Sequence, residues 1–259
     1  MKYGICHLSV VPCRKEPSDR SEQTTQLLFG ETIKVYEKRK SWYRIKTSTD
    51  NYECWIDEKQ FLWIDQKEHE ALNSNKPTVV TDFAQLILAK ENNEPITLLL
   101  GSTLPNYRGE KLKVANKSWH YQGEQRNTKT VLPKTSIKDF AMLYLNAPYL
   151  WGGRSPFGID CSGFVQMVYK LIGIILPRDA YQQAELGSKL SFIEEAEEGD
   201  LAFFDNEEGK ITHVGIILAN NNIIHASGQV RIDKLDHQGI FNKDLNDYTH
   251  HLRLINKIY

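Results

Sequence analysis

Residues 149–170, YLWGGRSPFGIDCSGFVQMVYK, place a single cysteine, Cys161, directly after an acid and at the start of an apolar-periodic segment. Asp160 is a residue type that commonly caps helices, and Phe164 and Val168 follow at helical spacing. A thiol in the first helical turn meets backbone amides and the positive end of the helix dipole, which favour its thiolate form. The neighbouring Asp160 charge acts in the opposite sense. The stretch therefore predicts a helix that begins at a reactive, low-pKa cysteine.

Two histidines have the context of partners for this thiol. His213 opens the apolar segment HVGIILA, His225 closes the segment NIIHAS, and ANNN lies between the two segments. A hairpin of this length places the two imidazoles side by side, so that one acts as a base and the other orients it. The same residues admit an alternative, a zinc site of Cys161, His213 and His225. Because no fourth ligand is evident in the sequence, we expect no metal and no other cofactor.

The composition is that of a globular protein with about two domains. The chain has 259 residues, a net charge of −1, 41% hydrophobic and 25% charged residues. This charge balance gives no reason to expect a nucleic-acid or anionic-membrane partner. No run of about 20 apolar residues exists, so no membrane span is predicted.

The start of the chain and the cysteine count bear on where the protein acts. The first residues, MKYGICHLSVVPC, lack the uninterrupted apolar core of a signal peptide, which predicts a cytoplasmic protein. A chain cut from a longer precursor would instead be periplasmic or secreted. Besides Cys161, only Cys6, Cys13 and Cys54 are present, and their spacing fits neither a disulfide scaffold nor a zinc motif. We therefore expect reduced thiols.

The first half of the chain is rich in strand patterns. Residues 1–65 alternate apolar and polar side chains between turn signals, residues 66–77 are polar and end near a proline, and residues 78–132 are strand-rich again. LLFGETI and LLLGSTL agree in four of seven positions, one in each strand-rich part. This echo predicts two small β-barrels in tandem, joined by a linker.

The second half has a different pattern. Residues 133–259 begin with two helical segments and continue with GDLAFFD, HVGIILAN, NIIHASG and VRIDKL, which read as strands. Helices that precede an antiparallel sheet are typical of an α+β domain. The fold class predicted for the whole chain is therefore two small all-β barrels followed by an α+β domain.

Five blocks of this second half resemble the NlpC-type bacterial cell-wall cysteine peptidases, which are papain-like. The blocks are YLWGGRSPFGIDCSGFVQ, LPRDAYQQ, GDLAFF, HVGIIL and IIHASG, in the order that the family keeps. The upstream parts resemble bacterial SH3-type domains. The arrangement as a whole is similar to that of γ-D-glutamyl-L-diamino acid endopeptidases of the dipeptidyl-peptidase VI type, which trim peptidoglycan peptides.

The resemblance implies a role for individual positions. Cys161 would be the nucleophile, His213 the general base and later the acid, and His225 the residue that orients His213. Tyr149 stands twelve residues before the cysteine, where the family has a tyrosine whose hydroxyl helps to bind the oxyanion. From the sequence pattern alone, Tyr149 is an aromatic residue after a proline. The backbone amide of Cys161 would be the second oxyanion donor.

The resemblance also implies a substrate-binding set. In relatives with two SH3-type domains, the first barrel closes one end of the cleft and selects a free amino terminus. Here Glu22 and Tyr52 stand in the corresponding barrel segments, and Asp160 and Ser162 flank the nucleophile. Cys54 occupies a position where relatives usually have glycine, which puts the loop that carries Tyr52 in doubt.

The function implied is hydrolysis of the γ-D-glutamyl–diamino acid bond in peptidoglycan-derived peptides with a free N-terminal L-alanine, within muropeptide recycling. The partner expected is this peptide, and a monomer is expected. Two alternatives stay open: a non-catalytic wall-peptide-binding protein, and an acyltransferase that uses the same thioester chemistry.

Overall fold

The computed structural model describes residues 1–115 and 117–259, which divide into two compact units. Unit 1 comprises residues 1–131 together with the short segments 151–156 and 173–175. Unit 2 comprises the remaining residues from 132 onward. The sequence placed the last domain boundary at residue 133, one position from the start of unit 2. In the described part of the chain, no helix has both the length and the apolar character needed to cross a membrane.

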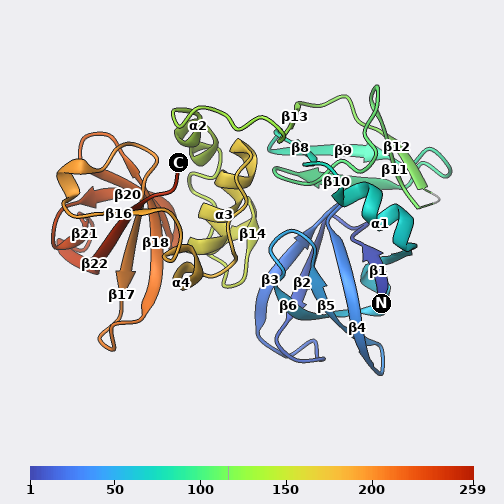
Figure 1. The fold of residues 1–259 in the computed structure, drawn as a ribbon, viewed down its shortest axis with the longest axis horizontal. Helices are drawn as coiled ribbons and strands as arrows, with labels where there is room; N and C mark the ends of the chain where they lie inside the picture. Colours follow the sequence, from blue (N-terminus) through green and yellow to red (C-terminus); the bar gives the residue numbers. More distant parts are fainter. Residues whose placement is uncertain (116) are drawn as a thin grey trace. The chain divides into compact units, whose positions relative to one another are not determined.

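Unit 1 begins with an all-β region, drawn in blue in Figure 1. Its seven strands form one antiparallel sheet in the order β3-β2-β6-β5-β4-β1-β7. Alternate side chains of these strands point inward, as the sequence pattern predicted, and bury a core that includes Val11, Leu27, Ile45 and Ile56. The strands are β1 (Lys2–Ile5), β2 (Val10–Arg14), β3 (Gln23–Leu28), β4 (Thr32–Arg39), β5 (Trp42–Thr47), β6 (Glu53–Asp57) and β7 (Leu62–Ile64), with a 3₁₀ turn at Glu58–Gln60.

Three of the four cysteines lie in this core. Cys6, Cys13 and Cys54 are buried, and none of them forms a disulfide bond. Burial raises the pKa of the Cys54 thiol well above its usual value, and its hydrogen bond with Cys13 acts in the same direction. These thiols therefore serve as small apolar core residues, and the sulfur of Cys54 fills space that a glycine would leave empty.

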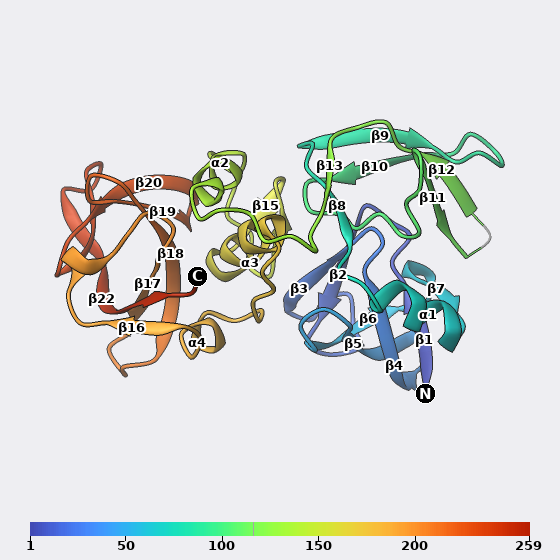
Figure 2. The ribbon, with the colours of Figure 1, turned by 45° about the horizontal axis from the view of Figure 1, so that its top comes forward.

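The predicted linker 66–77 contains a helix, α1 (Gln66–Asn73), capped by the Asp65 carboxylate, which accepts the Glu68 amide at 2.8 Å. His69 is buried on its inner face and stacks on Tyr3 of β1, with ring centroids 4.2 Å apart. Figure 2 shows this helix beside β1 and β7. The stacking of His69 on Tyr3 thus holds the capped helix α1 against the first sheet.

Residues 78–131 form pairs of short strands instead of one continuous sheet. The pairs are β9 with β10, β11 with β12, and β8 with β13. Their apolar side chains, such as Val80, Leu98 and Trp119, share one core with Ile5 and Phe29 from the first sheet. The strands are β8 (Thr78–Val80), β9 (Ala84–Leu88), β10 (Pro95–Leu99), β11 (Lys111–Val114), β12 (Lys117–His120) and β13 (Gln125–Asn127).

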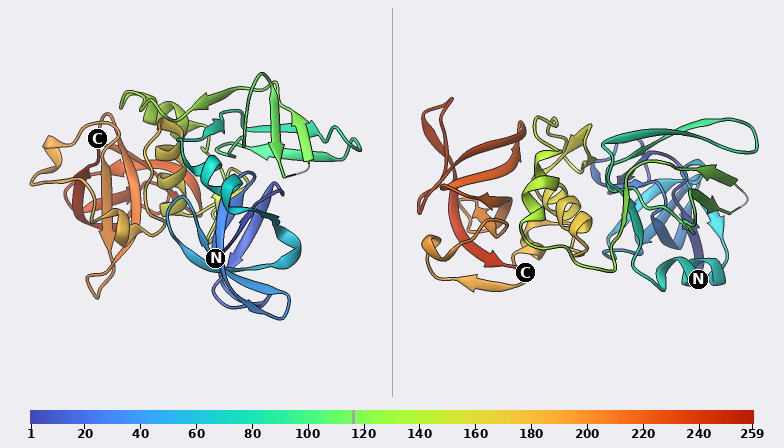
Figure 3. Two further views of the ribbon diagram at one scale, coloured as in Figure 1. Left: turned by 45° about the vertical axis from the view of Figure 1, so that its right-hand side comes forward. Right: turned by 90° about the horizontal axis from the view of Figure 1, so that it is seen from above.

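Unit 2 is the predicted α+β fold. Its main sheet runs β16-β22-β17-β18-β19-β20-β21, and β22 also pairs with β21, so that six strands close on themselves. Figure 3 shows these orange and red strands curling round, with helix α3 beside them. The elements are α2 (Ser136–Met142), β15 (Gly158–Ile159), α3 (Cys161–Ile172), α4 (Ala180–Gln183), β16 (Ser188–Leu190), a 3₁₀ turn at Ile193–Glu195, β17 (Leu201–Asp205), β18 (Ile211–Leu218), β19 (Asn222–Ser227), β20 (Gln229–Leu235), β21 (Gly239–Asn242) and β22 (Asp247–Lys257); β14 (Arg154–Ser155) belongs to unit 1.

Helix α3 positions the cysteine. Every residue of α3 is buried, and the helix packs against β18 and β19. Phe164 lies in T-shaped contact with Tyr144, with ring centroids 5.8 Å apart, and the Tyr169 hydroxyl donates to the Gly199 carbonyl at 2.7 Å. A buried helix with fixed aromatic and polar contacts gives its first residue a defined place over the sheet.

Candidate active site

Cys161 is the first residue of α3, as the sequence predicted. The Asp160 carboxylate accepts the Gly163 amide at 2.7 Å, and the Asp160 carbonyl accepts the Phe164 amide at 2.9 Å. Asp160 is therefore the N-cap residue. The Cys161 Sγ lies 3.9 Å from the Thr212 carbonyl oxygen and accepts a hydrogen bond from the Val214 amide. Those two residues flank His213 on β18.

The predicted low pKa of the thiol is wrong. Burial raises the pKa of Cys161 to about 12, and the Asp160 charge adds to the rise. The Val214 amide and the Arg178 charge act in the opposite direction but do not outweigh burial. Only 7% of Cys161 is exposed, so the loss of hydration of a thiolate exceeds the benefit from the helix start. The Cys161 thiol is therefore neutral at rest and would need a base in order to react as a nucleophile.

The two predicted histidines form a direct pair. Strands β18 and β19 are joined by a tight turn in which Asn220 and Asn221 both have positive φ, and Gly215 lies opposite His225. A Cβ at Gly215 would lie 2.9 Å from the His225 Cβ, so the missing side chain leaves room for the imidazole. His213 Nε2 and His225 Nδ1 are 2.8 Å apart. The hairpin brings the two rings together as expected.

Behind His225 lies an ion pair that the sequence analysis missed. His225 Nε2 is 3.0 Å from Asp233 Oδ2, and Arg231 donates to both oxygens of that carboxylate at 2.6 and 2.9 Å. Arg231 also pairs with the exposed Asp244 at 2.8 Å. The sequence did contain a pattern that could have predicted Asp233. A hairpin centred on Gly228 pairs His225 with Arg231, and the alternation of side chains in VRID puts Asp233 on the same face of the sheet as His225.

The Asp233 carboxylate assigns the proton positions of the relay. A carboxylate can only accept, so His225 donates from Nε2 and its Nδ1 accepts the Nε2 proton of His213. This leaves Nδ1 of His213 as the ring nitrogen without a proton. Burial lowers the pKa of His213 well below its usual value, and repulsion between its protonated form and protonated His225 or His250 acts in the same direction. His213 is therefore neutral and able to accept a proton.

A third histidine adjoins the pair. His250 of β22 stacks on His213 with ring centroids 4.1 Å apart, and burial lowers its pKa to about 4. One ring nitrogen from each of His213, His225 and His250 lies within 4.8 Å of the others. Among the described residues, this group, and not one that includes Cys161, has the spacing of metal ligands.

Tyr149 lies in the same unit as the thiol. Its amide donates to the Gly228 carbonyl at 2.9 Å. Burial raises the pKa of Tyr149 to about 12, and the Cys161 and Asp160 charges add to the rise. The hydroxyl therefore keeps its proton at neutral pH and stays a hydrogen-bond donor close to these two groups.

Arg178, whose role the sequence left undecided, binds both predicted ammonium-binding residues of unit 2. Its guanidinium donates to the two oxygens of Asp160 at 3.0 and 2.5 Å and to the Ser162 hydroxyl at 2.8 Å. All three side chains are buried. The Asp160 charge is thus balanced within the fold, which limits its effect on Cys161.

Glu22 and Tyr52, the other predicted substrate residues, lie in unit 1. Glu22 is exposed, accepts the Trp151 indole N–H at 2.8 Å and pairs with Lys15 at 3.1 Å. These hydrogen bonds from Lys15 and Trp151 lower the pKa of Glu22. Tyr52 is half-buried in the β5–β6 turn, where its amide donates to the Thr47 hydroxyl at 2.9 Å.

The segment that carries Trp151 is fixed to the first sheet of unit 1. Arg154 is buried and forms a two-pronged ion pair with Glu31, at 2.8 and 3.0 Å. It also donates to the Gln26 carbonyl at 2.6 Å, and Gln23 donates to the Trp151 carbonyl at 3.0 Å. Trp151 therefore reaches Glu22 from an anchored backbone.

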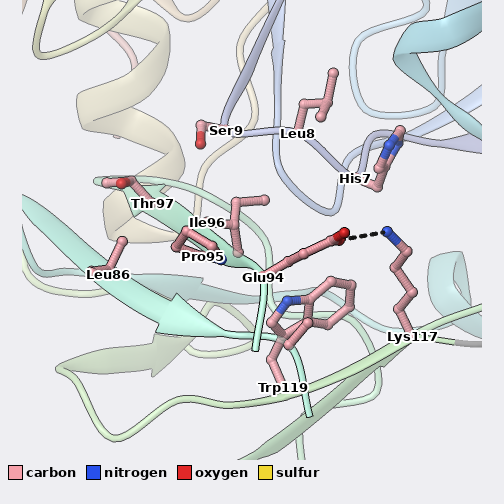
Figure 4. A pocket seen from close by; sticks show the side chains of 11 residues that line it. His7, Leu8, Ser9, Leu86, Glu94, Pro95, Ile96, Thr97, Lys117 and Trp119 are labelled. Carbon is pink, nitrogen blue, oxygen red and sulfur yellow. Dashed lines mark ion pairs between the residues drawn. The ribbon is translucent and has the colours of Figure 1, made fainter. Parts of the chain in front are cut away.

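A separate cavity of about 540 Å³ lies within unit 1 (Figure 4). Trp119, Ile96 and Pro95 form its apolar side, and Glu94 pairs with Lys117 at 3.6 Å across one end. None of the predicted site residues lines it. The cavity is thus lined by residues of unit 1, from the loop between β1 and β2 and from residues 86–119.

Two protein families match parts of the chain. Residues 146–248 match the NlpC/P60 family and residues 13–61 match the bacterial dipeptidyl-peptidase SH3 domain. The chain therefore contains a domain of the NlpC/P60 cysteine peptidase family, preceded by a bacterial SH3 domain.

Among characterised proteins, the chain is homologous to dipeptidyl-peptidases. It is 28% identical over 226 residues to the γ-D-glutamyl-L-lysine dipeptidyl-peptidase of Bacillus cereus, an alignment that covers 78% of this chain and 66% of that protein. It is 26% identical over 255 residues to dipeptidyl-peptidase 6 of Lysinibacillus sphaericus, covering 89% and 91% of the two chains. The match thus spans slightly less than two thirds of the length of the Bacillus cereus protein.

Solved structures share the fold. An NlpC/P60 family protein from Bacillus cereus superposes with a TM-score of 0.83 at 21% identity, covering 99% of both chains. An NlpC/P60 endopeptidase from Photobacterium damselae gives 0.76 at 18% identity, covering 99% of this chain and 71% of that one. At these identities the likeness concerns the fold alone.

Proposed function

We propose that the protein is a cysteine endopeptidase that hydrolyses the γ-D-glutamyl–diamino acid bond of peptidoglycan-derived peptides with a free N-terminal L-alanine. The observation that carries this proposal is the buried series of contacts from His213 to His225 and Asp233, on a strand whose backbone on either side of His213 contacts the Cys161 sulfur. The homologous dipeptidyl-peptidases, whose name specifies a γ-D-glutamyl-L-lysine bond, support the substrate class.

The chemistry follows from the protonation states. As the Cys161 sulfur attacks the γ-carbonyl carbon, Nδ1 of His213 takes the thiol proton, so the raised pKa of the thiol is overcome only in the transition state. The His213 imidazolium then gives this proton to the departing amine of the diamino acid. Water, deprotonated by the same nitrogen, hydrolyses the thioester and restores the thiol.

Two donors would stabilise the oxyanion. The Cys161 backbone amide lies at the start of α3, where helix amides have no partner within the helix. The Tyr149 hydroxyl, whose pKa is raised to about 12, remains protonated at neutral pH and can donate as the carbonyl oxygen gains charge.

We further propose that Glu22 and Tyr52, with Asp160 and Ser162, hold the ammonium group of the N-terminal L-alanine. The lowered pKa of Glu22 keeps its carboxylate charged, and the Trp151 indole orients it. Because Arg178 already balances Asp160, Glu22 would supply most of the attractive charge. Lys15 would have to leave Glu22 when substrate binds, at little cost, because the pair is exposed.

The β-rich region 78–132 is proposed to be a second SH3-like module. The turns of the two echo segments agree in detail: Gly30 and Gly101 have φ of 80° and 81°. In each turn a side chain accepts the amide of the residue three positions earlier, Glu31 from Leu28 at 3.0 Å and Ser102 from Leu99 at 3.1 Å. A shared turn of this kind supports a repeated unit.

A role in muropeptide recycling as a cytoplasmic monomer is also proposed, because a requirement for a free amine excludes peptides still attached to the wall through alanine. The decisive experiment is mass spectrometry of L-Ala-γ-D-Glu-diaminopimelate and its lysine analogue after incubation with the pure protein and with Cys161→Ala. Release of the free diamino acid by the wild type alone supports the proposal.

The same experiment separates the alternatives. Binding without cleavage by the wild type would indicate a wall-peptide-binding protein. Transfer of L-Ala-D-Glu to an added amine, in preference to water, would indicate an acyltransferase.

A further inference from the structure

His250 is the one member of the imidazole cluster that the proposed mechanism does not use. Its ring centroid lies 4.1 Å from that of His213 and 5.6 Å from that of His225. It reaches this place from β22, whose neighbour in the sheet, β17, lies between it and β18. Three imidazoles on three strands thus meet, with one nitrogen of each within 4.8 Å of the others.

Two of these nitrogens are already prepared as metal donors. Asp233 accepts the Nε2 proton of His225, which leaves the lone pair of Nδ1 facing His213. A carboxylate behind a histidine is the arrangement that orients histidine ligands in zinc proteins. His250 Nδ1 lies 2.9 Å from the Thr249 hydroxyl, and donation there leaves Nε2 of His250 free to bind.

Only the third nitrogen has to give up a proton. His213 Nε2 is 2.8 Å from His225 Nδ1 and shares its proton with it. Two nitrogens bound tetrahedrally to zinc at about 2.0–2.1 Å lie about 3.3 Å apart, so the rings would separate by roughly 0.5 Å. Zinc would take the place of this proton at Nε2, and the proton would move to Nδ1 of the same ring, so that His213 binds as a neutral imidazole.

We propose that His213, His225 and His250 bind a zinc ion, with water completing the coordination, and that the bound ion switches the peptidase off. The loss of activity rests on the proposed function, whereas metal binding does not. The inhibition has a direct cause. With zinc on Nε2, Nδ1 of His213 carries the ring proton and cannot accept the proton of the thiol, and the hydrogen bond from His213 to His225 is gone. Zinc is an inhibitor here and not a cofactor.

The ligand types of the proposed site determine which metal ions it favours. Three imidazoles favour zinc, copper or nickel over magnesium or calcium, which prefer oxygen ligands. Cys161 is not part of the group of nitrogen atoms. The proposed site therefore differs from the coordination of a metal by the nucleophilic thiol, and the two can be separated experimentally.

Binding is tested first, without substrate. Isothermal titration of the metal-free full chain with zinc is expected to show one site in the wild type and in Cys161→Ala. His250→Phe keeps an aromatic ring against His213 and removes the nitrogen, and His250→Gln is a second variant in case packing fails. Because loss of an outer partner already weakens metal sites 10–100-fold, loss of a ligand should weaken zinc binding at least about tenfold.

The matched control is His251→Phe. His251 is the exposed neighbour of His250 on β22, so its loss should leave zinc affinity unchanged. Cobalt replaces zinc as an optical probe, and its visible bands without a near-ultraviolet thiolate charge-transfer band are expected. A thiolate band that disappears in Cys161→Ala would overturn the three-histidine site.

Peptidase activity is measured in the second experiment, and the rate of each variant is divided by the rate of the same variant without metal. Half of the wild-type activity should be lost at the zinc concentration that half-fills the calorimetric site, and EDTA should restore it. His250→Phe should need at least about ten times more zinc. If the protein has a measurable peptidase rate and stoichiometric zinc binding does not lower it, the proposed inhibition is overturned. If the metal-free protein has no peptidase rate at all, that result counts against the proposed function alone. Absence of zinc binding would overturn the site itself.

Discussion

Asp233→Asn isolates the part of the site farthest from the thiol. Asp233 is 6% exposed, accepts the His225 Nε2 proton at 3.0 Å and receives two hydrogen bonds from Arg231. In Asp233→Asn, an amide nitrogen at the Oδ1 position faces an N–H donor of Arg231. At the Oδ2 position it faces N–H donors of both Arg231 and His225. No orientation of the amide therefore satisfies the relay, and Asp233 acts as a positioning residue for His225.

The size of the effect follows from the hydrogen bond that is weakened. A hydrogen bond to a charged group contributes about 1.5–3 kcal/mol, and 1.36 kcal/mol corresponds to a tenfold change in rate. We therefore expect kcat to fall by about 10–150-fold. The KM should change little, because Asp233 is not among the proposed substrate contacts. The loss is smaller than that expected for removal of the base, since His213 keeps its place on β18.

The assay is steady-state release of the diamino acid from L-Ala-γ-D-Glu-diaminopimelate, followed by mass spectrometry. Side-chain ¹⁵N NMR of the histidines gives a second readout, because a changed His225 tautomer moves its nitrogen shifts whereas a merely structural effect does not. Asp244→Asn is the matched control: its side chain is 77% exposed and touches the same Arg231 from outside, so kcat should stay within about twofold. A kcat for Asp233→Asn within threefold of wild type, or an equal loss in Asp244→Asn, would refute the reasoning.

Four further outcomes are expected. His213→Ala should lower kcat by several orders of magnitude and His225→Ala by less, because one moves the proton and the other orients it. N-acetylation of the peptide should lower kcat/KM by roughly a hundredfold or more, and Glu22→Ala should reduce this discrimination by slowing the free peptide. Iodoacetamide should label Cys161 about tenfold faster per pH unit between pH 7 and 9, since the thiol pKa near 12 keeps the thiolate scarce throughout this range. Arg154→Met should destabilise unit 1 by about 3–5 kcal/mol in urea unfolding, because the buried Glu31 loses its partner.

Each of these four predictions has a result that would contradict it. A larger loss in His225→Ala than in His213→Ala would exchange the two roles. Equal rates on free and acetylated peptide would remove the selection for a free amine. A labelling rate that levels off near neutral pH would indicate a low-pKa thiolate, as in a thiolate–imidazolium pair. The control for Arg154 is Lys15→Met, which breaks an exposed ion pair and should cost less than about 1 kcal/mol; an equal cost would contradict the argument from burial.

The amino-acid sequence was enough to predict the order of the elements and the main chemical groups of the site. Apolar periodicity after Asp160 defined helix α3, and the ANNN turn defined the β18–β19 hairpin that pairs the two histidines. These predictions held because each depends on residues close together in the chain, where capping, turn geometry and side-chain period act locally.

The electrostatics of the site and the contacts between distant residues became apparent only from how the chain packs. Burial of Cys161 reversed its expected pKa, because the cost of removing a thiolate from water depends on everything packed around it. Arg178 comes to Asp160 from 18 positions along the chain, and His250 reaches His213 because β17 pairs with both β22 and β18. Such contacts depend on how strands and helices far apart in sequence pack, which no local pattern specifies.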